Sequence, residues 1–160
     1  MGAIVAFSSC EDDPCETVVC QNDGVCSDGV CDCPDGYSGT LCETEQRTVF
    51  LGTYNAAEEC SSAPFFTDHF VMKLTASASE KDQFTLDNLY NFGANSIVIA
   101  TVTSDTTFKV KSQNITEQSL TQFNVVGSGK ISGKIITLEY VISDTDIGSS
   151  DNCTTVLTPQ

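Results

Sequence analysis

The sequence predicts a mainly β protein, in which a small disulfide-rich module precedes an eight-stranded antiparallel up-and-down β-barrel. Six of the nine cysteines fall between residues 15 and 42. From residue 47 onward, short runs alternate between apolar and polar side chains, which is typical of antiparallel strands with one buried face. Two further cysteines, Cys60 and Cys153, stand near the two ends of this second part. A β-sandwich is the alternative architecture.

The charge and the cysteine content limit the classes of function. A dense set of disulfides requires an oxidising compartment, so we expect an exported protein. The net charge is −15, and residues 1–46 contain ten acidic side chains and no Lys or Arg. Because no basic patch is present to displace counterions from phosphates, we expect no nucleic-acid partner. The same argument disfavours adhesion to anionic lipid through charge alone.

Three segments follow from composition: residues 1–13, 14–43 and 47–160. In the first, an apolar run ends in Ser8-Ser9-Cys10, which resembles the lipobox of lipoprotein signal peptides in Bacteroidetes-type bacteria. The resemblance implies a lipid anchor on Cys10 and an outer-membrane location, and an odd cysteine also calls for separate chemistry. Glu11-Asp12-Asp13 is similar to a tag that directs such lipoproteins to the extracellular side. The alternatives are a frayed N-terminus with a free thiol and a solvated acidic linker.

The second segment has the spacing C-x4-C-x5-C-x4-C-x-C-x8-C and ends in Cys33-Pro-Asp-Gly36-Tyr37-Ser-Gly39-Thr-Leu-Cys42. This pattern resembles the EGF-like domain. Six cysteines allow 15 pairings, and the resemblance implies Cys15–Cys26, Cys20–Cys31 and Cys33–Cys42. So short a segment cannot bury a sufficient core, so each disulfide should stabilise it by roughly 2–4 kcal/mol. We expect neither zinc nor calcium, because no histidine is near and only four residues separate Cys26 from Cys31.

The third segment contains eight alternating runs. They cover approximately residues 48–56, 69–77, 82–90, 96–104, 106–113, 120–130, 134–143 and 151–158. Closure of such a meander removes both unpaired edges and makes its first and last strands neighbours. A Cys60–Cys153 disulfide would then clasp the seam. Gly52-Thr53-Tyr54 resembles the G-x-W opening of lipocalins, with Tyr in place of Trp, so the expected barrel is lipocalin-like.

Aromatic side chains are expected to point into this barrel, where they either form a packed core or line a ligand pocket. They are Phe50, Tyr54, Phe70, Phe84, Phe108, Phe123 and Tyr140. Ordinary core packing is the simpler interpretation of the set.

No motif of an enzyme is present. His69 is the only histidine, and the sequence lacks a Gly-x-Ser-x-Gly elbow, a His-Glu-x-x-His pair and a phosphate-binding loop. We therefore expect no catalytic residues and no cofactor. The leading hypothesis is a cell-surface lipoprotein in which the EGF-like module is a spacer and the barrel engages a protein or a glycan. The alternative is a carrier of a small apolar ligand, and a weaker third possibility is a barrel that blocks another enzyme through its loops.

Overall fold

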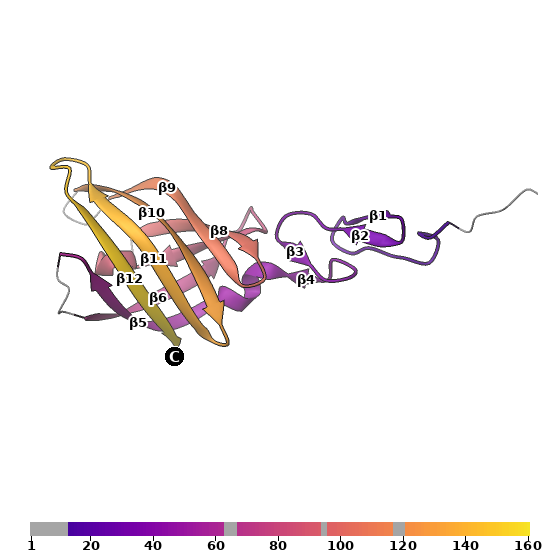
Figure 1. Cartoon of the computed structure of the whole chain (residues 1–160), viewed down its shortest axis with the longest axis horizontal. Helices are drawn as coiled ribbons and strands as arrows, with labels where there is room; N and C mark the ends of the chain where they lie inside the picture. The colour runs from indigo at the N-terminus through magenta and orange to yellow at the C-terminus, as the bar shows by residue number, and fades with distance from the viewer. Residues whose placement is uncertain (1–12, 63–66, 94–95, 117–120) are drawn as a thin grey trace, which may run out of the picture.

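The computed structural model describes residues 13–62, 67–93, 96–116 and 121–160. A small N-terminal module lies at one end of the molecule and a β-barrel forms the remainder (Figure 1). The predicted lipid-attachment site, Cys10, lies outside the described residues, as do Glu11 and Asp12. Among the helices of the described part, none has the length and hydropathy needed to cross a membrane.

The N-terminal module is held together by disulfides rather than by a hydrophobic core. Its regular structure consists of two small antiparallel pairs, β1 (Val25–Ser27) with β2 (Val30–Asp32) and β3 (Tyr37–Ser38) with β4 (Thr44–Glu45). The structure pairs Cys15 with Cys26, Cys20 with Cys31, and Cys33 with Cys42. Cys42 is completely buried.

The larger part is a closed antiparallel barrel of eight strands in the order β10-β11-β12-β5-β6-β7-β8-β9. Each strand pairs with its neighbour in sequence, and β12 pairs with β5 to close the ring. The strands are β5 (Gly52–Cys60), β6 (Asp68–Ala76), β7 (Gln83–Asp87), β8 (Ile97–Ser104), β9 (Thr107–Thr116), β10 (Gln122–Ser132), β11 (Ile135–Asp144) and β12 (Ser150–Pro159). The predicted up-and-down barrel is confirmed, and the β-sandwich is excluded.

Several predicted strand boundaries are wrong: β5 ends at Cys60 rather than at residue 56, and β9 ends at Thr116 rather than at residue 113. At two further boundaries the barrel interior competes with strand formation. Residues Gln46–Phe50 form a 3-10 helix, η1, where a strand was expected from residue 48. This helix places Phe50 inside the barrel, where its carbonyl accepts a 2.9 Å hydrogen bond from the Tyr54 hydroxyl. The third predicted strand ends at Asp87 rather than at residue 90, because Asn88 adopts a left-handed conformation that leads into a second 3-10 helix, η2 (Leu89–Asn91).

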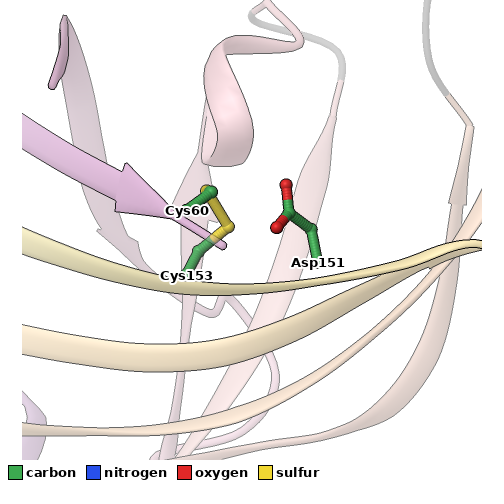
Figure 2. A group of neighbouring side chains, drawn as sticks. All are labelled: Cys60, Asp151 and Cys153. Atoms are coloured by element: carbon green, nitrogen blue, oxygen red, sulfur yellow. A yellow bond between two sulfur atoms is a disulfide. The ribbon is translucent and has the colours of Figure 1, made fainter. Parts of the chain in front are cut away.

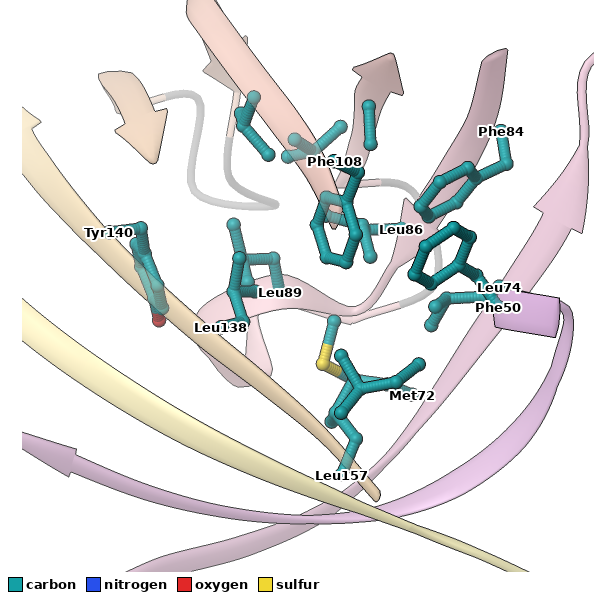
Figure 3. Close-up of a cluster of buried hydrophobic side chains, with 14 of the residues drawn as sticks. Phe50, Met72, Leu74, Phe84, Leu86, Leu89, Phe108, Leu138, Tyr140 and Leu157 are labelled. Atoms are coloured by element: carbon teal, nitrogen blue, oxygen red, sulfur yellow. The ribbon is translucent and has the colours of Figure 1, made fainter. Parts of the chain in front are cut away.

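Three phenylalanine rings fill the barrel interior near η1 (Figure 3). Phe50, Phe84 and Phe108 lie with ring centroids 5.1–5.4 Å apart, one pair stacked and two pairs edge-on. Gly129 makes this packing possible, because a Cβ atom at that position would overlap the Phe108 ring. Each ring is at most 1% exposed, so this half of the barrel is a packed core.

The barrel therefore has two different ends. The closed end carries η1, the N-terminal module and the connections 77–82, 105–106 and 133–134. The opposite end, here called the mouth, carries residues 61–62, 88–93 and 145–149, which adjoin the mouth ends of the strands. The mouth and the N-terminal module lie at opposite ends of the molecule (Figure 1).

Arg47 joins the module to the closed end. Its guanidinium donates to the carbonyls of Ser77, Glu80 and Gln83 at 2.8, 2.7 and 2.9 Å. The same side chain forms an ion pair with Glu45, and only 5% of Arg47 is exposed. One buried cation thus holds the linker against the turn between β6 and β7.

A candidate binding site at the barrel mouth

The mouth is built around the disulfide that closes the barrel. Cys60 of β5 lies directly opposite Cys153 of β12 in the register of the two strands, with their Cα atoms 4.1 Å apart. The Asp151 carboxylate lies beside this disulfide (Figure 2). These three side chains come as close as metal ligands would. However, both sulfurs are bonded to each other, and it is the thiolate that binds metals, so the group does not make a metal site.

Asp151 accepts hydrogen bonds on both oxygens. Its Oδ1 accepts from the Ser61 hydroxyl and the Ser62 amide at 2.6 and 2.8 Å. Its Oδ2 accepts from the Ser62 hydroxyl at 2.5 Å and from the Tyr90 hydroxyl at 3.0 Å. Burial opposes ionisation, but these donors outweigh it and lower the pKa of Asp151 to about 2. The group is therefore an anion that neutral donors hold in place.

Glu58 is a second inward-facing carboxyl, and its environment has the opposite effect. Only 4% of the residue is exposed, and its Oε2 accepts from the hydroxyls of Tyr140 and Thr155, both at 2.5 Å. Burial raises the pKa of Glu58, and the hydrogen bonds from Thr155 and Tyr140 offset this only in part. The negative charge of Asp151 raises it further, so the two carboxyls interact.

Aromatic side chains form the other wall of the mouth. Tyr90 contacts Phe92 edge-on at 5.0 Å, and Phe92 lies against Phe123 at 4.7 Å. Tyr90 has φ 56°, a left-handed conformation that costs about 1–3 kcal/mol for such a residue. The hydrogen bond from Tyr90 to Asp151 connects η2 to β12 across the mouth.

A small cup of about 200 Å³ opens between these groups. Its lining residues come from the mouth connections and the ends of β10, β11 and β12. They are Ser62, Tyr90, Phe123, Ile142, Asp144, Ser149, Ser150 and Asp151. The cup thus combines two carboxylates, two aromatic rings and hydroxyl groups in one concave surface.

The structure separates the seven aromatic residues that the sequence proposed as ligand-lining. Phe50, Phe84 and Phe108 pack against one another in the core. Tyr54 and Tyr140 are also buried, whereas Phe70 and Phe123 are only partly buried. Of the seven, Phe123 lines the cup. His69 is exposed on β6.

Sequence reasoning missed the polar residues of the mouth, although alternation marks them. Asp151, Cys153, Thr155 and Leu157 form one inward-facing row of β12. Glu58 continues the inward row of Tyr54 and Ala56 on β5. The strand prediction that stopped at residue 56 ended before Glu58. The position of Tyr90 carries no periodic signal, because η2 is irregular.

Comparison with known proteins identifies the N-terminal module. Residues 10–42 match the family model of the EGF-like domain, and the structure has its disulfides. The module is an EGF-like domain. A Giardia intestinalis protein named neurogenic locus notch homolog protein is 42% identical over 62 residues. That match covers 37% of this chain and about a tenth of the relative's length.

Solved structures resemble the barrel. A chain described as EF1p2_mFAP2b bound to DFHBI aligns with 73% of this chain and 100% of its own, with TM-score 0.52 and 12% identity. A candidate outer membrane protein of Bacteroides fragilis aligns over 75% of this chain and 54% of its own, with TM-score 0.47 and 19% identity. At these identities, the first similarity supports the barrel fold alone.

Proposed function

We propose that this chain is a non-enzymatic binding protein of the cell surface, which presents its barrel mouth to a partner protein. The filled interior is the observation that carries the proposal. Phe50, Phe84 and Phe108 occupy the closed half of the barrel, so little space is left there for a cargo. The cup at the mouth measures about 200 Å³, whereas small-molecule sites usually measure about 300–1,000 Å³. Recognition is therefore assigned to the outer surface.

The arrangement of the two parts supports a display function. The EGF-like module lies at the closed end, so the mouth is on the side of the barrel away from this module (Figure 1). Arg47 makes the junction stiff, because three backbone carbonyls accept hydrogen bonds from it. The module lacks Lys and Arg, so its negative charge would keep the barrel away from an anionic membrane surface.

We propose further that Cys10 carries a lipid that anchors the protein to the outer membrane, with the mouth facing outward. The small residues before Cys10 and the odd number of cysteines in the sequence support this. Replacing Cys10 with Ser should move the protein from the detergent phase to the aqueous phase in Triton X-114 partition. Protease added to intact cells should remove the wild-type barrel, and full protection of the barrel would contradict the outward orientation.

Blocking one end of the barrel at a time tests the display function. In a chain that also carries Cys10→Ser, a cysteine introduced at Ser149 or at Lys134 would be coupled to a polyethylene glycol. Ser149 lines the mouth cup, whereas Lys134 lies in the turn at the closed end. Polymer at Ser149 should abolish binding of the purified protein to intact cells that display the partner protein. Polymer at Lys134 should leave this binding unchanged. Equal loss at both positions, or loss at neither, would contradict recognition through the mouth.

Transport of a small apolar ligand is the second candidate function. It is favoured by the aromatic wall of the cup, where Tyr90 and Phe123 meet Ile142. A carrier would bind its ligand at this end, with the ligand penetrating toward the core. Co-purification of a non-covalent cargo would favour the carrier over the display function.

A further inference from the structure

The mouth has an excess of negative charge that no basic side chain neutralises. All seven Lys and Arg residues and His69 lie in the described part of the chain, and none of them lines the cup. Six of the seven are exposed, and the seventh, Arg47, is at the closed end. The one ion pair among the described residues is Arg47 with Glu45. The two carboxylates of the cup therefore have no protein cation as a partner.

The two carboxylates of the cup differ in what they can offer to a ligand. All hydrogen-bonding capacity of Asp151 is taken by Ser61, Ser62 and Tyr90, so Asp151 contributes charge. Oδ1 of Asp144 accepts hydrogen bonds from the backbone amides of Asp146 and Ile147. Its Oδ2 accepts no hydrogen bond from the described residues and remains free to accept one from a ligand.

An independent observation lies behind the cup, inside the barrel. Only 4% of Glu58 is exposed. Of its two carboxyl oxygens, only Oε2 accepts hydrogen bonds from described residues. Its charge interacts with Asp151 and with the Tyr90 phenol. Burial disfavours the charged form of Glu58, and no basic side chain is nearby to offset this, so a cation bound at the mouth would favour ionisation of Glu58.

The shape of the site distinguishes an organic cation from a metal ion. Metal binding needs several ligand atoms around one point, and among the described residues the only group of this kind contains the two bonded sulfurs. In contrast, the rings of Tyr90 and Phe123 line the cup beside the carboxylates. Aromatic faces attract an ammonium group and also contact an apolar stem. Carboxylates combined with aromatic rings therefore fit an alkylammonium group.

Taking the mouth as the display face proposed above, we propose that this cup binds an alkylammonium group, through Asp144 and Asp151 and beside the rings of Tyr90 and Phe123. The group belongs either to a free small amine or to a lysine side chain of the partner protein. A volume of about 200 Å³ accommodates one such side chain but not a folded loop. The negative charge of the cup selects the cation over a neutral isostere.

Titration of the ¹⁵N-labelled full chain with n-butylammonium, followed by NMR, is the direct test, with n-butanol as the neutral isostere. Saturable shifts at Ser149 and Asp151 should occur with the amine and not with the alcohol. Parallel titrations with N-acetyl-lysine methylamide and its norleucine analogue separate the sources. If the lysine derivative binds at least as well as the amine, the source is a protein side chain; if only the amine binds, the source is a free amine.

Variants identify the groups responsible. Asp144→Asn should weaken binding of n-butylammonium about tenfold, since a hydrogen bond to a charged group is lost. Phe123→Leu should weaken it about threefold through loss of the cation–π contact. Asp146→Asn is the matched control, because Asp146 is exposed in the same connection but does not line the cup. Its effect should stay within about twofold.

Equal shifts with amine and alcohol, no saturable shift with the amine, or equal effects of Asp144→Asn and Asp146→Asn would each overturn the ammonium site. Failure here is separable from failure of the display function. If polymer at Ser149 still blocks cell binding while the amine does not bind, only the ammonium site is wrong. If polymer at Ser149 has no effect, the display function itself fails.

Discussion

Two inward-facing carboxyls on adjacent strands of this barrel have opposite pKa shifts, and the number of hydrogen-bond donors explains the difference. Asp151 has four donors, which lower its pKa to about 2. Glu58 has two donors at one oxygen and lies deeper in the barrel, so burial dominates and its pKa is raised. Position inside a barrel therefore does not by itself determine the protonation of an acid.

Glu58→Gln should change how stability depends on pH. A raised pKa means that the folded state binds the Glu58 proton more tightly than the unfolded chain does. Its contribution to the free energy of unfolding is therefore complete below pH ~4.3 and is lost as pH rises through the folded pKa. Urea unfolding between pH 4 and pH 8 should show that the wild type loses stability relative to Glu58→Gln as pH rises.

Glu139→Gln is the control for this measurement, because Glu139 is exposed on the outer face of β11. Its stability profile should run parallel to that of the wild type. A wild-type profile that also runs parallel to Glu58→Gln would show that burial does not raise the pKa of Glu58.

At the scale of elements, the η1 segment joins the EGF-like module to the barrel. Arg47→Lys keeps the charge but loses the planar fork, in which Nη1 donates to the carbonyls of the β6–β7 turn while Nε and Nη2 contact Glu45. We expect a loss of about 1.5–3 kcal/mol in the free energy of unfolding. Residual dipolar couplings should also report a wider range of module orientations. Lys81→Ala, an exposed change in the same turn, should leave both measurements unchanged, and a single fixed orientation in Arg47→Lys would contradict the role of Arg47.

Sequence patterns predicted the barrel strands well, because period-two alternation reports burial directly. In the run 134–143, the alternating apolar residues Ile136, Leu138, Tyr140 and Ile142 are all buried in the barrel. The patterns failed where a contact distant in sequence decides local structure. Residues Gln46–Phe50 form a 3-10 helix because the Phe50 ring packs in the core of the barrel. No local sequence signal marks that contact.

The candidate site was less predictable than the fold. Asp151 and Glu58 occupy alternating inward positions and could have been found by extending the pattern. Tyr90 and Ser62 reach the mouth from irregular connections, whose conformation depends on the hydrogen bonds with Asp151. Such positions follow from the assembled barrel rather than from the order of residues.

For the whole molecule, the Cys60–Cys153 disulfide fastens the seam where the first and last barrel strands meet. It spans 93 residues, so it should restrict the unfolded chain by about 4–5 kcal/mol. The double variant Cys60→Ser with Cys153→Ser should lose about this much free energy of unfolding in urea. Hydrogen exchange should increase first in β5 and β12.

The matched control is Cys33→Ser with Cys42→Ser, which opens a disulfide of the EGF-like module. Barrel strands should keep their protection from hydrogen exchange in that variant. If both double variants lower barrel protection equally, then the seam disulfide has no special role in closure.

The central claim is that the barrel is filled and that recognition takes place at its mouth. Native mass spectrometry of the folded protein, purified from its own membrane, tests this most directly. We predict the mass of the chain with four disulfides and its covalent modifications, with no further mass lost on denaturation. A non-covalent cargo of stoichiometric amount that leaves on denaturation would contradict the claim and establish a carrier.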